Sequence, residues 1–326
     1  MSPSPLDGAA DLVVAPLPSD HPALSRRVVP AIYSSGSTAR AWQTAAPDCE
    51  GADAVMLHDT PRRDLATTAH DVLSRGHALW YGVGIDGWAR DLRSGARSRA
   101  QITARAVEIA LRAREQGAEL LMPNGEAAFR RASGTDDTDA RVEGALAEAL
   151  HAVSVRVPDL ALGWTSYDHV LWHPIGWAEV VGLVSPVVVH SAQVYGALGG
   201  GALATYAGLL ARAERGGAQR AKLVSHGSAR AELMDGGAGW RPYLQLHGVQ
   251  ARATVAYALA QRGVCLWALA TRADEAGREA LGVLIGVARA GLWGDVRALQ
   301  RAVGVADDGV YGPLTHTAVL RWAAGP

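Results

Sequence analysis

Short apolar, β-branched runs alternate with polar loops and helix-period segments along most of the chain. The pattern predicts eight β-strands. These strands are expected near Val28 to Tyr33, Ala52 to His58, Ala78 to Ile85, Glu119 to Met122, Leu160 to Thr165, Val187 to Ser191, Lys222 to His226 and Val264 to Ala270. Strands that alternate with helices in this way are typical of a parallel α/β fold.

The clearest predicted helix follows Ser98 and stops at Gly117. Its apolar positions recur at helical spacing on one face, namely Ile102, Ala106, Ile109, Ala110 and Ala113. Further helices are predicted over Asp64 to Ser74, Asp139 to Val153, Ala202 to Glu214, Gln250 to Gln261 and Asp274 to Ala290. The units repeat, and no antiparallel hairpin signal interrupts them. We therefore expect a closed (β/α)₈ TIM barrel rather than a doubly wound open sheet.

The length and composition support a large folded core, with 326 residues of which 49% are apolar. The expected organisation has three parts. An N-terminal extension covers residues 1–25, the barrel covers residues 26–293, and a short helical appendage covers residues 294–326.

Charge and cysteine usage exclude several classes of function. The formal net charge is −1, and the chain has no run of five like charges, so a general nucleic-acid-binding role is disfavoured. Cys49 and Cys265 make neither a CxxC nor a Cys/His metal spacing. No segment predicts a membrane span, and the first residues lack the features of a signal peptide. We expect synthesis in the cytoplasm.

Polar side chains follow most of the predicted strands, at the barrel end where catalytic groups of this fold lie. Glu126, after the fourth strand, is the leading candidate for a general acid. It could instead cap the next helix or pair with an arginine. Asp86, Asp168 and Tyr195 are the candidate supporting groups. Candidate substrate-binding residues at the same end are Asn124, Tyr33, Trp88, Tyr167, Gln193, His190, His226 and Trp267.

Two other kinds of site receive less support. His58, His190 and His226 follow strands, but no HxH or HExxH motif accompanies them, so we predict no metal site. Gly82, Gly84 and Gly87 form a GxGxxG, but on the third strand and with a carboxylate inside it. We therefore predict no dinucleotide site and no cofactor. The chain has no GxSxG elbow and no SxxK.

The last thirty residues resemble the helical peptidoglycan-binding module. The resemblance rests on an LQ-type helix, a DGxFG-like turn and a second helix opened by Thr or Ser. The matching residues are Val296, Leu299, Val303, Asp308, Gly309, Val310, Tyr311, Gly312, Thr315, Ala318, Val319 and Trp322. It implies a wall-binding role for Asp308, Gly309, Tyr311, Gly312 and Thr315. The module's first helix is not evident unless the segment from Gly282 to Leu292 supplies it.

The barrel, in turn, is similar at the level of architecture to the glycoside-hydrolase-type barrels of phage endolysins and other cell-wall lytic proteins. We expect a muralytic glycosidase that acts on bacterial peptidoglycan after phage-type release from the cell. One alternative is a non-catalytic wall-binding protein of a phage particle or injection machine. Another is a metal-dependent amidase or peptidase, which would need at least two of His58, His190 and His226 around one ion.

Overall fold

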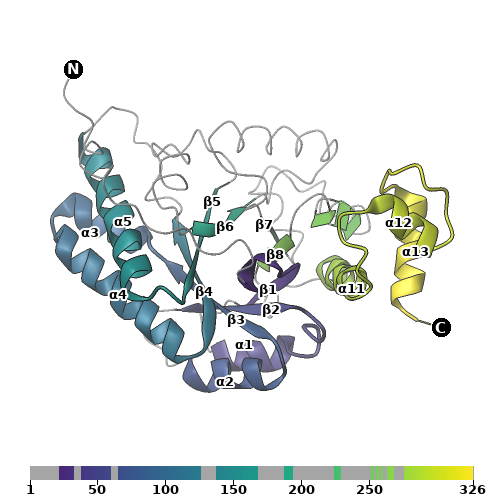
Figure 1. The fold of residues 1–326 in the computed structure, drawn as a ribbon, viewed down its shortest axis with the longest axis horizontal. Helices are drawn as coiled ribbons and strands as arrows, with labels where there is room; N and C mark the ends of the chain where they lie inside the picture. The colour runs from purple at the N-terminus through teal and green to yellow at the C-terminus, as the bar shows by residue number, and fades with distance from the viewer. Residues whose placement is uncertain are drawn as a thin grey trace.

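The computed structural model describes residues 22–32, 38–59, 65–125, 137–167, 187–193, 224–228, 251–252, 255–256, 258–259, 263–267 and 275–325. Eight parallel strands close into a barrel in which each strand pairs with the next and β8 pairs with β1 (Figure 1). The strands are β1 (Val28–Ile32), β2 (Ala54–Asp59), β3 (Ala78–Gly84), β4 (Ala118–Gly125), β5 (Ala161–Tyr167), β6 (Val187–Gln193), β7 (Val224–Ser228) and β8 (Gly263–Trp267). The predicted TIM barrel is confirmed, and every predicted strand overlaps an observed one.

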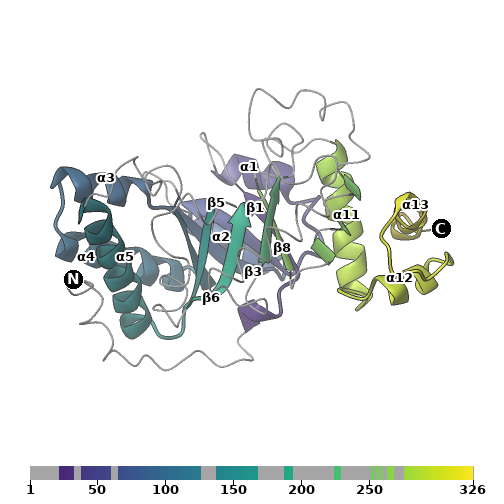
Figure 2. The same ribbon diagram turned by 90° about the horizontal axis from the view of Figure 1, so that it is seen from above.

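Helices flank the barrel where the described chain connects the strands (Figure 2). They are η1 (Pro22–Leu24), α1 (Thr38–Ala45), α2 (Ala66–Ser74), α3 (Asp86–Ser94), α4 (Arg99–Glu115), α5 (Asp137–Arg156), α11 (Glu275–Arg289), α12 (Val296–Ala302) and α13 (Pro313–Ala323). The predicted helix from Ala202 to Glu214 lies outside the described residues. Among the described helices, none is long and apolar enough to cross a membrane.

Helix α4 begins and ends as its sequence predicts. The Ser98 hydroxyl accepts a hydrogen bond from the Gln101 N–H at 3.3 Å, and Gln101 Oε1 accepts the Ser98 N–H at 2.8 Å. This reciprocal capping box satisfies two N–H groups at the start of the helix. The chain leaves the helix through Gly117, whose φ of +83° favours glycine. Helix α3 was not predicted, because it is short and has a glycine, Gly87, in its first turn.

The barrel has an inner and an outer apolar layer. Alternate strand residues form the inner cluster, which includes Met56, Trp80, Leu120, Met122 and Ala161. The intervening residues pack outward against the helices in a larger cluster. This alternation follows from the period of two along a strand, and it fixes which strand-end residues face the barrel interior.

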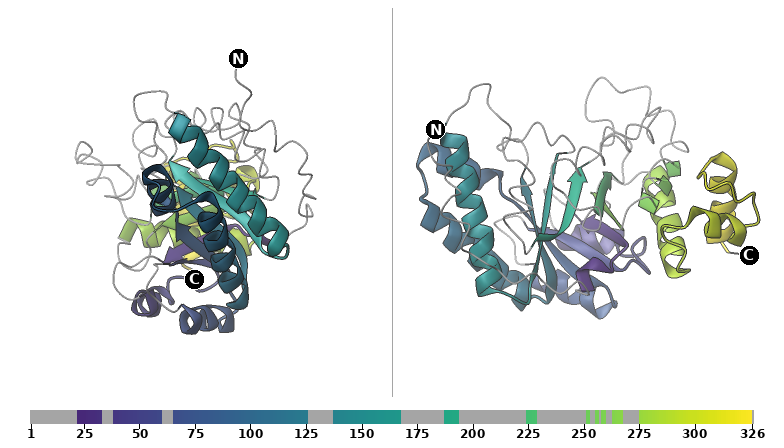
Figure 3. Two further views of the ribbon diagram at one scale, coloured as in Figure 1. Left: turned by 90° about the vertical axis from the view of Figure 1, so that its left-hand side faces the viewer. Right: turned by 45° about the horizontal axis from the view of Figure 1, so that its top comes forward.

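The C-terminal helices pack on the barrel through α11. Helix α11 contacts both β1 and α13, and α12 and α13 lie on the far side of α11 from the barrel (Figure 3). Gly286 of α11 faces α13, since a Cβ added there would be in ordinary van der Waals contact with Ala323 and Trp322, at 3.6 Å from each. Leu299, Tyr311 and Val319 belong to the same apolar cluster as the outer layer of the barrel.

Candidate functional site

The strand register gathers several candidate residues into neighbouring positions on the inner face. Asn124 pairs with Gly84 on one side and Thr165 on the other, in line with the inner residues Met122 and Leu120. Higher in the barrel, Gln193 pairs with both Tyr167 and His226. Parallel partners share a face of the sheet. The backbone therefore assigns Asn124, Tyr167, Gln193 and His226 to the inner set of positions at the carboxyl end of the barrel.

The same register separates His190 from this group. His190 pairs with Trp164, which alternates with the inner positions Gly163 and Thr165. Its backbone position therefore belongs to the outer set, next to the helices. This placement argues against the predicted substrate-binding role of His190, and against an ion shared by all three histidines. Trp267 pairs with Ser228, and both fall in the inner set.

For several of the predicted site residues, the structure describes the backbone alone or does not describe the residue. Glu126, Asp168, Tyr195 and Tyr33 lie outside the described residues. Only the backbone is described at Tyr167, His190, Gln193, His226 and Trp267. Glu126 directly follows Gly125, the last residue of β4. Its role as the acid stays a prediction.

His58 places a buried imidazole inside the barrel, against the glycines of β3. A Cβ added at Gly82 would lie 3.1 Å from His58 Cδ2 and 3.3 Å from Met56 Sδ, so a larger residue would crowd the ring. A Cβ at Gly84 would lie 3.8 Å from His58 Cε1. Gly82, the first glycine of the GxGxxG, thus has a packing role, whereas the distance at Gly84 is an ordinary van der Waals contact. The third, Gly87, lies in the first turn of α3.

Burial lowers the pKa of His58 to about 4, and a backbone hydrogen bond at Asp59 only partly opposes this shift. The imidazole is therefore neutral at neutral pH. From the sequence, we consider His58 only as a metal ligand. The glycines on the neighbouring strand could also have indicated that the His58 ring packs against that strand. Within the described part of the chain, no group of three or more His, Cys, Asp or Glu residues could hold a metal ion.

Asp86 and Asn124 lie at the ends of neighbouring strands. Asp86 is the first residue of α3, where the positive end of the helix dipole favours a carboxylate. The preceding residue, Ile85, donates its N–H to the Asn124 carbonyl oxygen at 2.9 Å, which fixes the start of α3 against the end of β4. Asp86 is half-buried. Asp86 and Asn124 therefore place one carboxylate and one amide residue at the carboxyl ends of β3 and β4.

Trp88 occupies a different place from the one predicted. Its side chain is 8% exposed and packs in the outer apolar cluster with Ala89 and Ile85. Trp88 is the third residue of α3, so its ring anchors that helix to the barrel. This environment leaves little ring surface for a sugar, and it argues against the predicted stacking role.

Asp59 is the last residue of β2, and its side chain faces the helices. Its Oδ2 accepts a hydrogen bond from Arg112 Nη2 of α4 at 2.7 Å, and its side chain is 4% exposed. Burial raises the pKa of Asp59, whereas the Tyr81 hydroxyl and the charges of Arg112 and Arg105 lower it. The ion pair ties β2 to α4, so Asp59 is part of the barrel wall.

In the C-terminal segment, Gln300 holds the turn that carries the resemblance. Gln300 Nε2 donates to Asp308 Oδ1 at 2.7 Å, to the Val310 carbonyl at 3.0 Å and to Thr315 Oγ1 at 3.1 Å. Gln300 Oε1 accepts the Gly309 N–H at 2.8 Å. Gln300 is only 1% exposed. Asp308, Gly309 and Thr315 therefore stabilise the turn. This structural role was not part of the prediction, which assigned them to wall binding.

Tyr311 and Gly312 also have structural roles. The Tyr311 hydroxyl lies 3.1 Å from His316 Nδ1, and His316 Nε2 lies 3.2 Å from Glu279 Oε1 of α11. Gly312 is the N-cap of α13. The chain of contacts from Tyr311 to Glu279 connects the turn to α11. The exposed apolar side chains here are Val310 of the turn and Leu314 of α13, which are 58% and 81% exposed.

Comparison with known proteins supports the fold. No protein-family model and no curated protein sequence matches the chain. Among solved structures, a chitinase from Rhizomucor miehei is similar over 78% of this chain and 99% of its own, with 13% identity and a TM-score of 0.52. An endo-β-N-acetylglucosaminidase from Cordyceps militaris is 14% identical over 79% of this chain and 90% of its own, with a TM-score of 0.48.

A sugar epimerase is also among the solved structures that resemble the chain. An L-ribulose 3-epimerase is 13% identical over 92% of this chain and 97% of its own, with a TM-score of 0.46. The structural neighbours are thus TIM-barrel glycoside hydrolases and sugar epimerases. At these identities the similarity shows the fold alone, and the activity has to be argued from the site.

Proposed function

We propose that this protein is a glycoside hydrolase that cleaves the glycan strands of bacterial peptidoglycan. The observation that carries the proposal is the polar inner face at the carboxyl end of the barrel. Asn124, Tyr167, Gln193 and His226 occupy inner positions there, and Glu126 follows the last residue of β4. The barrel shared with a chitinase is compatible with this assignment.

In the proposed reaction, Glu126 donates a proton to the glycosidic oxygen as the leaving sugar departs. Wall sugars carry a 2-acetamido group, and its carbonyl oxygen would attack the anomeric carbon from within the substrate. Water then opens the resulting ring, and the Glu126 carboxylate takes up the proton that the water loses. The net reaction is hydrolysis with retention of configuration.

The proposed mechanism also needs a group that orients the acetamido nitrogen. Asp86 is our first choice, because it opens α3 just after β3, the strand next to β4, and because the start of α3 is fixed against Asn124 by the 2.9 Å hydrogen bond. Asp168 and Tyr195 are the reserves. His58 would contribute as a neutral hydrogen-bonding ring beneath them, since its pKa of about 4 keeps it uncharged.

The decisive test is digestion of purified sacculi by the full chain, with parallel assays for new reducing ends and new free amines. We expect reducing ends to accumulate without amines. Amines would instead identify an amidase or peptidase and would overturn the proposal. Binding with neither product would leave a non-catalytic wall-binding protein, which also contradicts it.

We further propose that the C-terminal segment holds the enzyme on the wall, through the exposed face that includes Val310 and Leu314. Such tethering raises the effective concentration of the barrel at an insoluble substrate. Truncation before Asp295 should weaken sedimentation with sacculi while the barrel stays folded. Unchanged sedimentation would contradict this role.

Two point variants distinguish exposed residues that contact the wall from buried residues that stabilise this segment. Leu314→Ser should weaken sedimentation and leave the fold intact, because the side chain is 81% exposed. Gln300→Leu should destabilise the segment by about 2–4 kcal/mol, because it removes the hydrogen bonds that Gln300 makes to Asp308, Gly309, Val310 and the buried Thr315. Amide hydrogen exchange of α12 and α13 distinguishes the two effects. Wild-type sedimentation by Leu314→Ser would exclude this face.

A further inference from the structure

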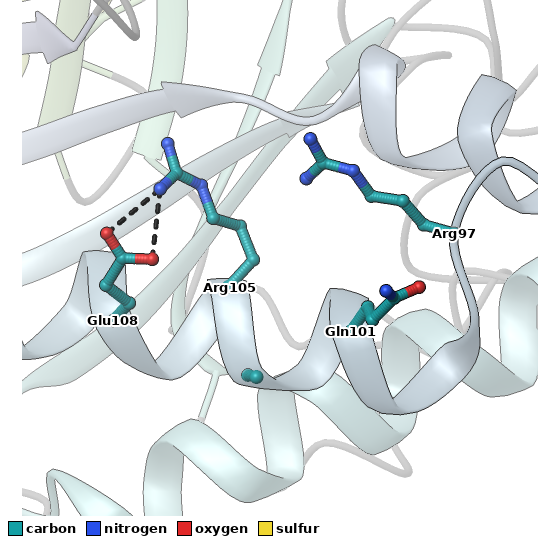
Figure 4. Close-up of a pocket in the computed structure, with 5 residues that line it drawn as sticks. Arg97, Gln101, Arg105 and Glu108 are labelled. Carbon is teal, nitrogen blue, oxygen red and sulfur yellow. Dashed lines mark hydrogen bonds and ion pairs between the residues drawn. The ribbon is translucent and has the colours of Figure 1, made fainter.

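A cavity lies outside the barrel, on the N-terminal half of α4. It has a volume of about 590 Å³ and is lined by Arg97, Gln101, Ala104, Arg105 and Glu108 (Figure 4). Gln101, Ala104, Arg105 and Glu108 recur at spacings of three and four, so they share one face of α4. Arg97 comes from the turn that joins α3 to α4 and extends over the same face.

The two guanidinium groups leave most of their donors available. Arg105 uses one nitrogen, Nη1, for both oxygens of Glu108, each at 3.0 Å. Arg97 pairs through Nε with Asp91 Oδ2 at 3.2 Å. Within the described part of the chain, no partner is recorded for Arg105 Nε and Nη2 or for the two terminal nitrogens of Arg97.

Gln101 adds a third donor. Its Oε1 is held by the Ser98 N–H in the capping box, which leaves the Nε2 amide group for a ligand. Ala104, whose side chain is small, is a further lining residue. Donors from three side chains thus line one open cavity.

The existing ion pairs are weak competitors for a ligand. The side chains of Arg97 and Asp91 are 47% and 36% exposed, and those of Arg105 and Glu108 are 28% and 60% exposed. Exposed pairs of this kind contribute at most about 1 kcal/mol. A guanidinium can meanwhile bind a carboxylate or phosphate through two parallel hydrogen bonds.

We propose that this cavity is an oxyanion-binding site that takes a carboxylate or phosphate group carried on a larger molecule. Its volume falls in the range of small-molecule sites, about 300–1,000 Å³, and leaves room around a single acidic group. Helix α3 runs from the barrel rim at Asp86 to Ser94, three residues before Arg97. At 1.5 Å per residue, it spans about 13 Å.

This distance suits a second contact on a branched polymer. If the proposed function holds, the occupant would be an acidic group of the wall, either a peptide carboxylate or the phosphate of an attached polymer. The binding site itself does not depend on that activity, because it can be tested with small anions on the intact protein.

The test is an NMR titration of the full chain at low ionic strength, with inorganic phosphate and N-acetylglutamate as separate probes. We expect millimolar affinity, with shifts at the backbone amides of Arg97, Gln101 and Arg105. Stronger binding of phosphate would favour a polymer phosphate, and stronger binding of N-acetylglutamate a peptide carboxylate. No shifts at these amides with either probe would overturn the proposal.

Three variants sharpen the test. Replacing Arg97 and Arg105 together by alanine should weaken binding at least tenfold. Arg114→Ala is the matched control, because Arg114 also lies on α4 but pairs with Asp159 at 3.7 Å, outside the cavity. Glu108→Gln should tighten binding two- to fivefold, since it releases Arg105 from its competitor. Equal affinity in the double variant and the wild type would contradict the site. Sacculus digestion reports separately on the proposed activity.

Discussion

The two ends of the barrel use their polar residues in opposite ways. At the amino-terminal end, Arg26 donates from Nε and Nη2 to the two carboxylate oxygens of Glu119 at 2.9 and 2.8 Å. Glu119 Oε1 also accepts Trp80 Nε1–H at 2.9 Å. Ala23 of η1 packs into the inner cluster, and η1 contacts β4 and β6. The polar groups of Arg26, Glu119 and Trp80 therefore bind one another at this end of the barrel.

At the carboxyl end, polar residues lie near the neutral imidazole of His58 and the two glycines of β3. His58 lies against Gly82 and Gly84, and Asp86 and Asn124 stand at the adjacent strand ends. Strand β4 joins the two environments, with Glu119 as its second residue and Glu126 directly after its last. Under the proposed function, a glutamate's place along a barrel strand decides between a stabilising and a chemical role.

The largest expected effect concerns Glu126. Glu126→Gln should lower the rate of glycan cleavage by about 10²–10⁴-fold, because an amide keeps the shape of the acid but cannot protonate the leaving oxygen. Reducing-end release from sacculi measures the rate. Sedimentation with sacculi is the control and should be unchanged. Full activity in this variant would remove Glu126 from the mechanism.

Glu119→Gln is the matched change at the other end of β4. It should reduce the free energy of unfolding by about 2–3 kcal/mol, because Arg26 loses a charged, partly buried hydrogen-bond partner. Urea denaturation measures this loss. The cleavage rate of the folded variant should match the wild type. A stable variant with low activity would reverse the roles assigned to the two glutamates.

The smallest effect is the pH dependence that His58 imposes on stability. Because its folded pKa of about 4 lies below the ordinary value of 6.5, the unfolded chain binds the extra proton first as the pH falls. Stability from neutral His58 is fully present above pH 6.5 and is lost toward pH 4. Between pH 6.5 and 5 the loss should reach about 2 kcal/mol.

His58→Leu should remove this part of the acid sensitivity. Unfolding free energies of both proteins at a series of pH values measure the difference. If the variant loses stability as steeply as the wild type over this range, His58 is not buried as a neutral ring, and the polar rim rests on a different arrangement.

Most of the barrel could be predicted from sequence, for a physical reason. A parallel strand buried on both faces is a short apolar run, and each helix carries an apolar stripe, as Ile102, Ala106 and Ile109 do on α4. The capping serine and the terminal glycine of α4 are local signals as well. Helix α3 ends at a glycine as well, Gly95 with a φ of +71°, but it lacks the starting signal, since its N-cap, Ile85, makes no side-chain cap.

The site was less predictable, because roles depend on neighbours that are distant in sequence. Asp59 and Asp86 both follow strands, but only the register and the 2.7 Å contact with Arg112 show that Asp59 faces a helix. Trp88 packs in the core, although its type suggests stacking. His190 and Gln193 are three residues apart, so they fall on opposite faces of β6.

The most direct test of the account compares cleavage of N-acetylated and de-N-acetylated glycan strands by the same enzyme preparation, with the anomeric configuration of the product followed by NMR. We expect reducing ends from the N-acetylated strands only, formed with retention of configuration. Undiminished cleavage of the de-N-acetylated strands, or an inverted product, would contradict a glycosidase in which Glu126 acts with the substrate's own acetamido group.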